Sequence, residues 1–326
     1  MNRTTIAAVI PSFKVKNSIL KVIEGIGPEV HLIYVIDDCC PDGSGDFVEQ
    51  FCRDPRVTVV RHTSNQGVGG AVMTGYKSAM EAGADIMIKL DGDGQMDPAL
   101  IKNFIAPILR KEADYTKGNR FYDLETLKSM PSARLFGNAV LSFMTKFSSG
   151  YYHVFDPTNG YTAISATAAR MLPLSKISRR YFFESDILFR LNTIGAVVTD
   201  IPMAAVYGDE ISNLHIRKIL FPFLKGHFLN FSKRVFYNYF LRGFSIATLE
   251  LVVGLVMLIF GTLFGLQAWY FSSAHANVAS SGTVMLSALP IILGVQLLLS
   301  FLHYDIENVP KISLVRLLHV GSDAKP

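Results

Sequence analysis

Two long apolar runs near the C-terminus constrain the fold of this chain more than any other feature. They cover residues 244–270 and 284–302. The hydrocarbon core of a bilayer is about 30 Å thick, and about 20 apolar residues cross it as a helix. Buried core helices are the alternative, but runs longer than about 18 residues are difficult to bury in a small soluble domain. The sequence therefore predicts two transmembrane helices.

The distribution of basic residues predicts how these helices are oriented. Residues 272–282, between the two runs, contain no Lys or Arg. The flanking basic residues are Lys225, Lys233, Arg234 and Arg242 before the first run and Lys311 and Arg316 after the second. Basic residues favour the cytoplasmic side, and residues 6–10 are too short for a secretory signal. We expect an integral membrane protein with the catalytic domain and both termini in the cytoplasm.

Charge and cysteine content narrow the class of partner. The net charge of +4 lies largely beside the apolar runs, which favours an anionic lipid surface over nucleic acid. Cys39, Cys40 and Cys52 have neither the spacing of a zinc site nor a paired framework. The sequence predicts a reduced compartment, contact with a membrane and no nucleic-acid partner.

The region before the apolar runs has the pattern of an α/β domain. Short β-branched runs at residues 6–10, 32–36, 57–61 and 86–90 are each bounded by turn residues. Residues 68–79 have helical spacing, and Gly83 follows where a helix would end. Alternating strands and helices predict an open, largely parallel sheet, in which ligands bind beyond the carboxyl ends of the strands.

Two adjacent aspartates, Asp37 and Asp38, follow the second predicted strand. One interpretation is that they only cap the next helix, which starts near Asp46. The alternative is a ligand site, and a second acidic segment at another strand end favours it.

That second segment is residues 91–98, which follow the fourth predicted strand and contain Asp91, Asp93 and Asp97 with glycines between them. Carboxylate oxygens on a mobile backbone suit Mg²⁺ or Mn²⁺ carrying a diphosphate. A calcium loop is similar but requires a bidentate Glu at its twelfth position, and none stands there.

A glycine-rich turn at residues 65–71 lies between the third strand and the next helix. It follows the wrong strand for a dinucleotide fingerprint, and its glycines are not spaced as G-x-G-x-x-G. The turn also lacks the lysine of a Walker A motif. A nucleotide sugar therefore fits these segments better than NAD or ATP.

Taken together, these segments resemble the inverting glycosyltransferases with an A-type nucleotide-diphospho-sugar fold, and more narrowly the polyprenyl-phosphate glycosyltransferases. The matching segments are residues 11–13, 35–38, 41–44, 65–71, 91–98, 118–120 and 156–161. They are colinear over about the first 210 residues. Residues 14–16, Lys-Val-Lys, depart from the family pattern, which has an acidic residue just after the first strand.

The resemblance implies a role for each matching residue. The donor-binding residues would be Pro11, Asp37, Asp38, Gly67 and Asp91. The metal ligands would be Asp91, Asp93 and Gln95, and the residues at the acceptor phosphate would be Arg120, Arg134 and Asn138. Asp156 and Asp93 would be the catalytic residues, although Asp156 alone reads as an ordinary turn residue and the arginines as surface residues. An arginine fork matches phosphate oxygens.

The implied activity is transfer of a hexosyl group, with inversion, from a nucleotide diphosphate sugar to a polyisoprenyl phosphate. A UDP-glucose-like donor is favoured and GDP-mannose is the alternative, with Mg²⁺ or Mn²⁺ as cofactor. A processive polysaccharide synthase would need more spans and a Gln-x-x-Arg-Trp motif, whereas the only tryptophan is Trp269 in the first run. A membrane scaffold or transporter component is the non-enzymatic alternative, since Glu250 lies in the same run.

The expected organisation has four parts. They are a glycosyltransferase domain at 1–210, juxtamembrane helices at 211–243, two transmembrane helices at 244–304 and a cytoplasmic tail at 305–326. Aromatic, aliphatic and basic residues are mixed through residues 215–240, which predicts an amphipathic helix in the headgroup plane. Homo-oligomers would form through the transmembrane helices.

Overall fold

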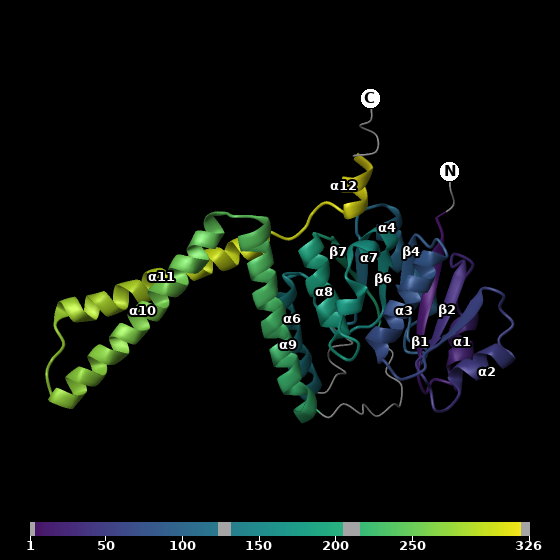
Figure 1. Cartoon of the computed structure of the whole chain (residues 1–326), viewed down its shortest axis with the longest axis horizontal. Coiled ribbons are helices and arrows are strands. Elements are labelled where there is room, and N and C mark those ends of the chain that lie inside the picture. The colour runs from purple at the N-terminus through teal and green to yellow at the C-terminus, as the bar shows by residue number, and fades with distance from the viewer. Residues whose placement is uncertain (1–3, 123–131, 205–215, 321–326) are drawn as a thin grey trace. The chain divides into compact units, whose positions relative to one another are not determined.

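A computed structural model of the chain describes residues 4–122, 132–204 and 216–320, and Figure 1 shows its elements. The chain forms two compact units. The first unit comprises residues 1–234 and 310–326, and the second comprises residues 235–309. The structure therefore groups the helix before the apolar runs, and the segment after them, with the α/β domain, whereas the sequence led us to expect separate parts.

The first unit is built on one seven-stranded sheet of order β3-β2-β1-β4-β6-β5-β7. The strands are β1 (Ile6–Ser12), β2 (Leu32–Asp37), β3 (Val57–Arg61), β4 (Ile86–Lys89), β5 (Tyr115–Asn119), β6 (Thr162–Ser165) and β7 (Val198–Pro202). Strand β1 pairs in parallel with both β2 and β4, and β2 pairs in parallel with β3. The four predicted strands and the predicted α/β fold are confirmed.

The far half of the sheet contains the one reversal among the described strands. Strand β6 is antiparallel to both of its neighbours, β4 and β5, whereas β5 and β7 are parallel. This reversal places residues 156–161, which precede β6, next to the carboxyl end of β4.

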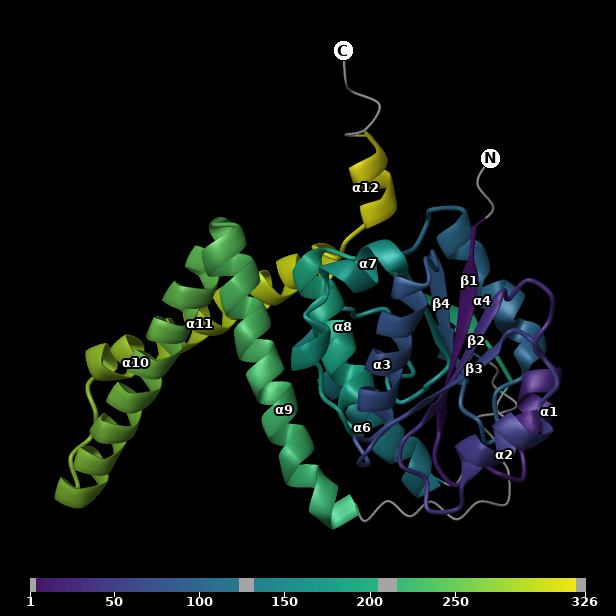
Figure 2. The same cartoon turned by 45° about the vertical axis from the view of Figure 1, so that its right-hand side comes forward.

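Helices cover both faces of the sheet, as Figure 2 shows. The helices that begin in the first unit are, in chain order, α1 (Ile19–Glu24), α2 (Ser44–Phe51), α3 (Val68–Glu81), η1 (Pro98–Leu100), α4 (Ile101–Leu109), α6 (Ser132–Ser149), α7 (Ala166–Met171), η2 (Leu174–Lys176), α8 (Phe183–Ile194), α9 (Ile216–Phe236) and α12 (Leu314–Val320). Alternate residues of a strand point to opposite faces. In β1, Ile10 accordingly joins the hydrophobic cluster that contains α1 and α4, while Val9 lies against Gly75 of α3.

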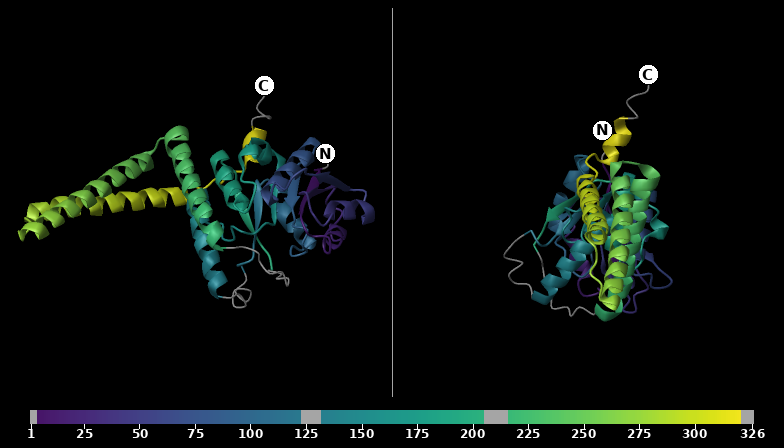
Figure 3. Two further views of the ribbon diagram at one scale, coloured as in Figure 1. Left: turned by 60° about the horizontal axis from the view of Figure 1, so that its bottom comes forward. Right: turned by 90° about the vertical axis from the view of Figure 1, so that its left-hand side faces the viewer.

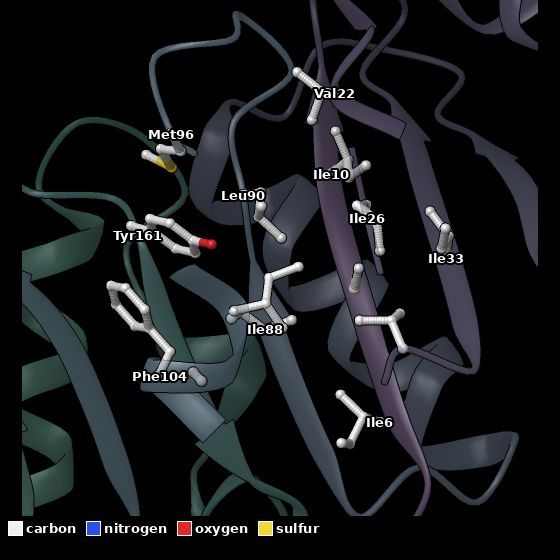
Figure 4. Close-up of a cluster of buried hydrophobic side chains, with 14 of the residues drawn as sticks. Ile6, Ile10, Val22, Ile26, Ile33, Ile88, Leu90, Met96, Phe104 and Tyr161 are labelled. Atoms are coloured by element: carbon white, nitrogen blue, oxygen red, sulfur yellow. The ribbon is translucent and has the colours of Figure 1, made fainter. Parts of the chain in front are cut away.

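Figure 4 shows the cluster on the α1 and α4 face. Tyr161, directly before β6, stacks on Phe104 of α4 with ring centroids 4.0 Å apart. The Tyr161 hydroxyl donates to the carbonyl oxygen of Asp97 at 3.0 Å. Met96 is also buried in this cluster. Aromatic stacking and burial thus fix both the segment 91–97 and the loop before β6.

The C-terminal helix α12 is fixed to the first unit by one buried carboxylate. Asp114, just before β5, is fully buried and accepts hydrogen bonds from the backbone N–H of Leu314 at 2.9 and 3.0 Å. It also accepts from the backbone N–H of Val197 at 2.9 Å. The hydroxyl of Ser313 donates to the carbonyl of Lys111 at 2.6 Å. The chain therefore returns to the first unit after the apolar runs.

Helix α9 buries a polar face against the first unit. The ring of His227 lies 2.8 Å from the hydroxyl of Ser148, and Asn230 donates to Asp186 at 3.1 Å. Burial lowers the pKa of His227 to about 4, so its ring is neutral at physiological pH. Arg234, which the sequence grouped with the cations at the lipid surface, is buried as well.

The outer face of α9 is apolar and basic at once. Phe221 and Phe228 are 75% and 69% exposed, and Lys225 and Lys233 are also exposed. Helix α6, which lies beside α9 in Figures 1 and 2, adds exposed aromatic side chains, among them Phe143. A soluble helix normally places its polar side outward, whereas α9 exposes large aromatic side chains together with its lysines and buries His227 and Asn230.

The second unit contains two long apolar helices, α10 (Ile246–His275) and α11 (Ser281–Glu307), preceded by the π-helix η3 (Tyr237–Arg242). Both are long and apolar enough to cross a membrane, and they form the hairpin seen in Figure 3. Gly254 and Gly294 allow close backbone approach, since a Cβ on Gly294 would lie 2.8 Å from the backbone nitrogen of Leu258. Glu250 accepts a hydrogen bond from Ser300 at 2.7 Å, so it has a partner within the hairpin.

Candidate functional site

The carboxyl ends of β1, β2 and β4 surround an open pocket of about 620 Å³. Its lining residues are Pro11, Ser12, Phe13, Val15, Asp38, Asn65, Gly67, Val68, Ala71, Lys89, Asp91, Gly92, Asp93, Arg180, Tyr181 and Glu184. Five predicted site residues are among them, namely Pro11, Asp38, Gly67, Asp91 and Asp93. This position beyond the strand ends is where open α/β sheets bind ligands.

Asp37 and Asp38 play different parts, although they are adjacent in sequence. The carboxylate of Asp37 accepts from the backbone N–H groups of Cys40 at 2.8 Å and Gly45 at 3.1 Å. A Cβ on Gly45 would lie 2.3 Å from this carboxylate, so only glycine permits the contact. Asp37 thus caps the turn into α2, which is the structural interpretation considered above. Its role in donor binding stays a prediction.

Asp38 joins the end of β2 to the glycine-rich turn. Its two oxygens accept from the backbone N–H groups of Gln66 at 2.7 Å and Gly67 at 2.8 Å. The ring of His62 lies 2.7 Å from the same carboxylate. The Asp38 carboxylate, bound by two backbone N–H groups, therefore fixes the turn at the pocket wall.

Gly67 brings a distant segment to the pocket. It has a φ of +83°, and a Cβ there would lie 2.5 Å from the carbonyl oxygen of Arg179. This close approach places Arg180 and Tyr181 in the pocket wall. Our sequence reasoning did not select either residue, although a basic and aromatic segment directly before a helix was a usable signal.

The acidic segment after β4 is held by its methionine. Met96 is buried, and its sulfur accepts from the backbone N–H of Asp91 at 3.2 Å. The carboxylate of Asp93 accepts from the backbone N–H of Gln95 at 2.9 Å. Gly94 has a φ of +83°, a conformation that favours glycine. Asp91 and Asp93 consequently both reach the pocket.

These residues fit a divalent cation carried by a diphosphate. Within the described ranges, no group of three or more His, Cys, Asp or Glu side chains is arranged to hold a metal by itself. Mg²⁺ does not require such a group, because it is usually bound through one or two carboxylates together with substrate phosphates and water. Asp91 and Asp93 supply two carboxylates in one pocket.

The predicted catalytic carboxylate and one predicted phosphate ligand form an ion pair. Asp156 is fully buried and accepts from Arg120 through Nε at 2.8 Å and Nη2 at 3.0 Å. The backbone N–H of Arg120 and the hydroxyl of Thr158 also donate to it, at 3.2 and 3.4 Å. Residue types and spacing did not indicate this pairing, because 36 positions separate the two residues.

The other predicted acceptor residues lie on α6. Asn138 is half-buried. The backbone of Arg134 belongs to the same helix, but its side chain lies outside the described residues. The placement of the phosphate-binding group beyond Arg120 therefore stays a prediction.

Lys89 and Glu184 line the pocket and Lys117 is buried nearby, and our sequence reasoning selected none of them. The ammonium of Lys89 lies 2.8 Å from Asp91, and Lys117 donates to the carbonyl oxygen of Asn159. Burial raises the pKa of Glu184, and both lysines oppose that rise. Burial also lowers the pKa of Lys117 to about 8, against the opposing effect of nearby carboxylates such as Asp156.

Known proteins show the same sequence family and fold. The family model described as "Glycosyl transferase family 2" matches residues 7–172. The UDP-N-acetylglucosamine–dolichyl-phosphate N-acetylglucosaminyltransferase of Methanococcus voltae is 29% identical over 215 residues, which cover 62% of this chain and 85% of that protein. The undecaprenyl-phosphate mannosyltransferase of Micrococcus luteus is 29% identical over 176 residues, covering 53% and 71%. The predicted resemblance is confirmed.

A solved structure shows the same architecture. Glucosyl-3-phosphoglycerate synthase from Mycobacterium tuberculosis, in complex with Mn²⁺, UDP and phosphoglyceric acid, superposes with a TM-score of 0.53 at 16% identity. The match covers 71% of this chain and 78% of that one. The predicted A-type nucleotide-sugar transferase fold is confirmed.

Burial of Lys117 makes the free energy of unfolding depend on pH. Its pKa is about 8 in the folded chain and near 10.5 when unfolded. Between these values the unfolded chain keeps a proton that the folded chain has lost, so the free energy of unfolding rises with pH. We expect Lys117→Met to remove this rise, as measured by denaturation followed by circular dichroism. Equal pH dependence in both proteins would contradict the assignment.

Proposed function

Because the chain belongs to glycosyl transferase family 2, we propose that it transfers a hexosyl group from a nucleotide diphosphate sugar to a polyisoprenyl phosphate. The observation that carries the proposal is that the predicted metal ligands and the loop of the predicted catalytic carboxylate lie together at the carboxyl end of β4. Asp91 and Asp93 line the pocket, and the loop containing Asp156 passes beside Asp91, since a Cβ on Gly160 would lie 3.0 Å from Asp91 Oδ2.

The reaction is a single displacement at the anomeric carbon. A phosphate oxygen of the lipid forms the new bond to this carbon while the bond to the diphosphate oxygen breaks, and the nucleoside diphosphate leaves with that electron pair. Attack from the opposite side inverts the configuration. The phosphate monoester has a second pKa near 6 and is largely dianionic at neutral pH, so no residue has to remove a proton from it.

The chain's own residues orient the two substrates. Arg120 presents a guanidinium held in place by Asp156 and is partly exposed, which suits a phosphate group. Asp91, Asp93 and Gln95 would hold a divalent cation, Mg²⁺ or Mn²⁺, which when bound supplies positive charge to the leaving diphosphate. Asp38 and the Gly67 turn form the wall proposed for the nucleotide.

The outer faces of α6 and α9 support an acceptor that resides in a membrane. Exposed Phe143, Phe221 and Phe228 combine with exposed Lys225 and Lys233. Aromatic groups suit the acyl boundary, and cations suit anionic headgroups. The α10 and α11 hairpin would span the bilayer, with the first unit and both termini on the cytoplasmic side.

A donor panel tests the function. The full chain would be incubated in vesicles with undecaprenyl or dolichyl phosphate, Mn²⁺ or Mg²⁺, and radiolabelled UDP-glucose, UDP-N-acetylglucosamine or GDP-mannose. We expect one donor to give an organic-extractable product that releases sugar on mild acid treatment. If every donor remained in the aqueous phase with either lipid, the proposal would be rejected. The panel also decides between UDP-glucose and the other donors.

The metal assignment predicts the behaviour of Asp93→Asn. We expect transfer to fall by at least about 100-fold at saturating Mg²⁺ or Mn²⁺, because a ligand oxygen and its charge are lost. Circular dichroism should be unchanged, since Asp93 lies in a loop. Asp97→Asn is the matched control in the same segment, because the Asp97 side chain does not line the pocket and caps η1 through the N–H of Ala99 at 2.9 Å. Similar activity of the two variants would contradict the assignment.

Asp156→Asn tests the carboxylate behind Arg120. We expect the variant to bind nucleoside diphosphate normally in calorimetry but to lose turnover, because Arg120 loses its ionic partner. The acceptor KM should rise while the donor KM stays the same. Unchanged turnover would make Asp156 a structural turn residue.

The outward aromatic side chains predict a membrane-specific defect. We expect the double variant Phe221→Ser and Phe228→Ser to bind nucleoside diphosphate normally but to transfer sugar poorly to a long-chain lipid in vesicles. Each phenylalanine contributes about 1.5 to 3 kcal/mol of apolar burial. A short, water-soluble prenyl phosphate should restore most of the rate. An equal loss with both acceptors would exclude a docking role.

A further inference from the structure

Lys89, the last residue of β4, is a lysine buried in the protein interior. Its side chain is 1% exposed, although the amphipathic lysine side chain normally keeps its ammonium in water. A buried ammonium without a partner would be costly, so buried lysines are almost always paired. The partners of Lys89 therefore indicate what its charge does.

The ammonium of Lys89 faces the acidic pocket. It lies 2.8 Å from Oδ1 of Asp91 and interacts electrostatically with Glu184. Both carboxylates line the pocket, together with Asp38 and Asp93. Four carboxylates in one pocket would repel a diphosphate, and the cations that line the pocket are Lys89 and Arg180.

Gly160 supplies the space for this ammonium. A Cβ on Gly160 would lie 2.2 Å from Lys89 Nζ and 3.0 Å from Asp91 Oδ2. The φ of Gly160 is not positive, so the backbone conformation does not require a glycine. The close approach of the ammonium and the carboxylate does.

We propose that Lys89 is a positioning residue of the donor site, whose buried ammonium fixes the Asp91 carboxylate and offsets the acidic charge around a nucleoside diphosphate. This inference rests on the proposed function, because it concerns the donor of that reaction. Lys89 holds Oδ1 of Asp91, and Oδ2 is left beside Gly160. Removal of the ammonium frees the Asp91 side chain and leaves its charge to repel the diphosphate.

The test measures binding of UDP and GDP to the full chain in detergent by calorimetry, in the presence of Mn²⁺. We expect Lys89→Met to weaken binding of the preferred nucleotide by at least about tenfold, which corresponds to one lost charge-assisted interaction. The donor KM should rise and the acceptor KM should stay unchanged. Lys102→Met removes an exposed charge on α4 and should leave nucleotide binding unchanged.

Gly160→Ala provides an independent variant that retains the lysine. Its Cβ would displace the ammonium, so we expect weaker nucleotide binding here too. In the Lys89→Met background the ammonium at 2.2 Å is gone and the Asp91 side chain can move away from the new Cβ, so the alanine should weaken binding by less than twofold. Such non-additivity is expected only of groups that interact directly. Additive losses would contradict a role for Gly160 in seating the ammonium.

The outcomes separate this inference from the proposed function. If wild type binds UDP or GDP and Lys89→Met binds it within twofold with the same donor KM, the role of Lys89 is rejected and the function stands. If Lys89→Met does not fold, Gly160→Ala decides, and binding within twofold of wild type rejects the inference. If wild type binds neither nucleotide, the proposed function fails and the inference fails with it.

Discussion

The parallel pairing of β1 with both β2 and β4 is the constraint on which the site depends. Because all three strands point the same way, the segments that leave their carboxyl ends meet at one edge of the sheet. Asp38 and Asp91 are 53 positions apart in sequence, yet they line the same pocket. The hydrophobic cluster then holds the segment after β4 and the loop before β6 in place, since Met96 and Tyr161 are buried in it. The positions of the polar pocket residues therefore depend on apolar packing.

Charge balance is the second theme of the site. The pocket collects carboxylates from the ends of β2 and β4 and from α8, and a chain cannot bury such a set without compensation. Asp37 and Asp38 are satisfied by backbone N–H groups, Asp156 by Arg120 and Asp91 by Lys89. These two kinds of partner, backbone N–H groups and cationic side chains, have different effects on the pocket. The amides fix Asp37 and Asp38 without adding a full charge, whereas Lys89 fixes Asp91 and also adds positive charge to the pocket.

Much of this arrangement could be predicted from local sequence. The β-branched runs gave the first four strands, and the aspartates directly after two of them gave the position of the pocket. What could not be predicted depends on contacts between distant segments. The pairing of Arg120 with Asp156 requires the antiparallel insertion of β6 between β4 and β5, which no local pattern encodes. Lys89 lay within a predicted strand, and no sequence motif indicated Glu184. The composition of residues 215–240 indicated an interfacial helix, but it did not reveal that His227, Asn230 and Arg234 turn inward.

The return of the chain through Asp114 and Leu314 has a mechanical consequence. A domain joined to a membrane segment by one flexible linker can rotate freely about that linker. Here the hairpin is an insertion, because the first unit contains residues on both sides of it. Two covalent attachments, in place of one, reduce the conformational freedom of the connection between the two units. A chain with two such attachments has less conformational entropy to lose when it binds the lipid acceptor that we propose.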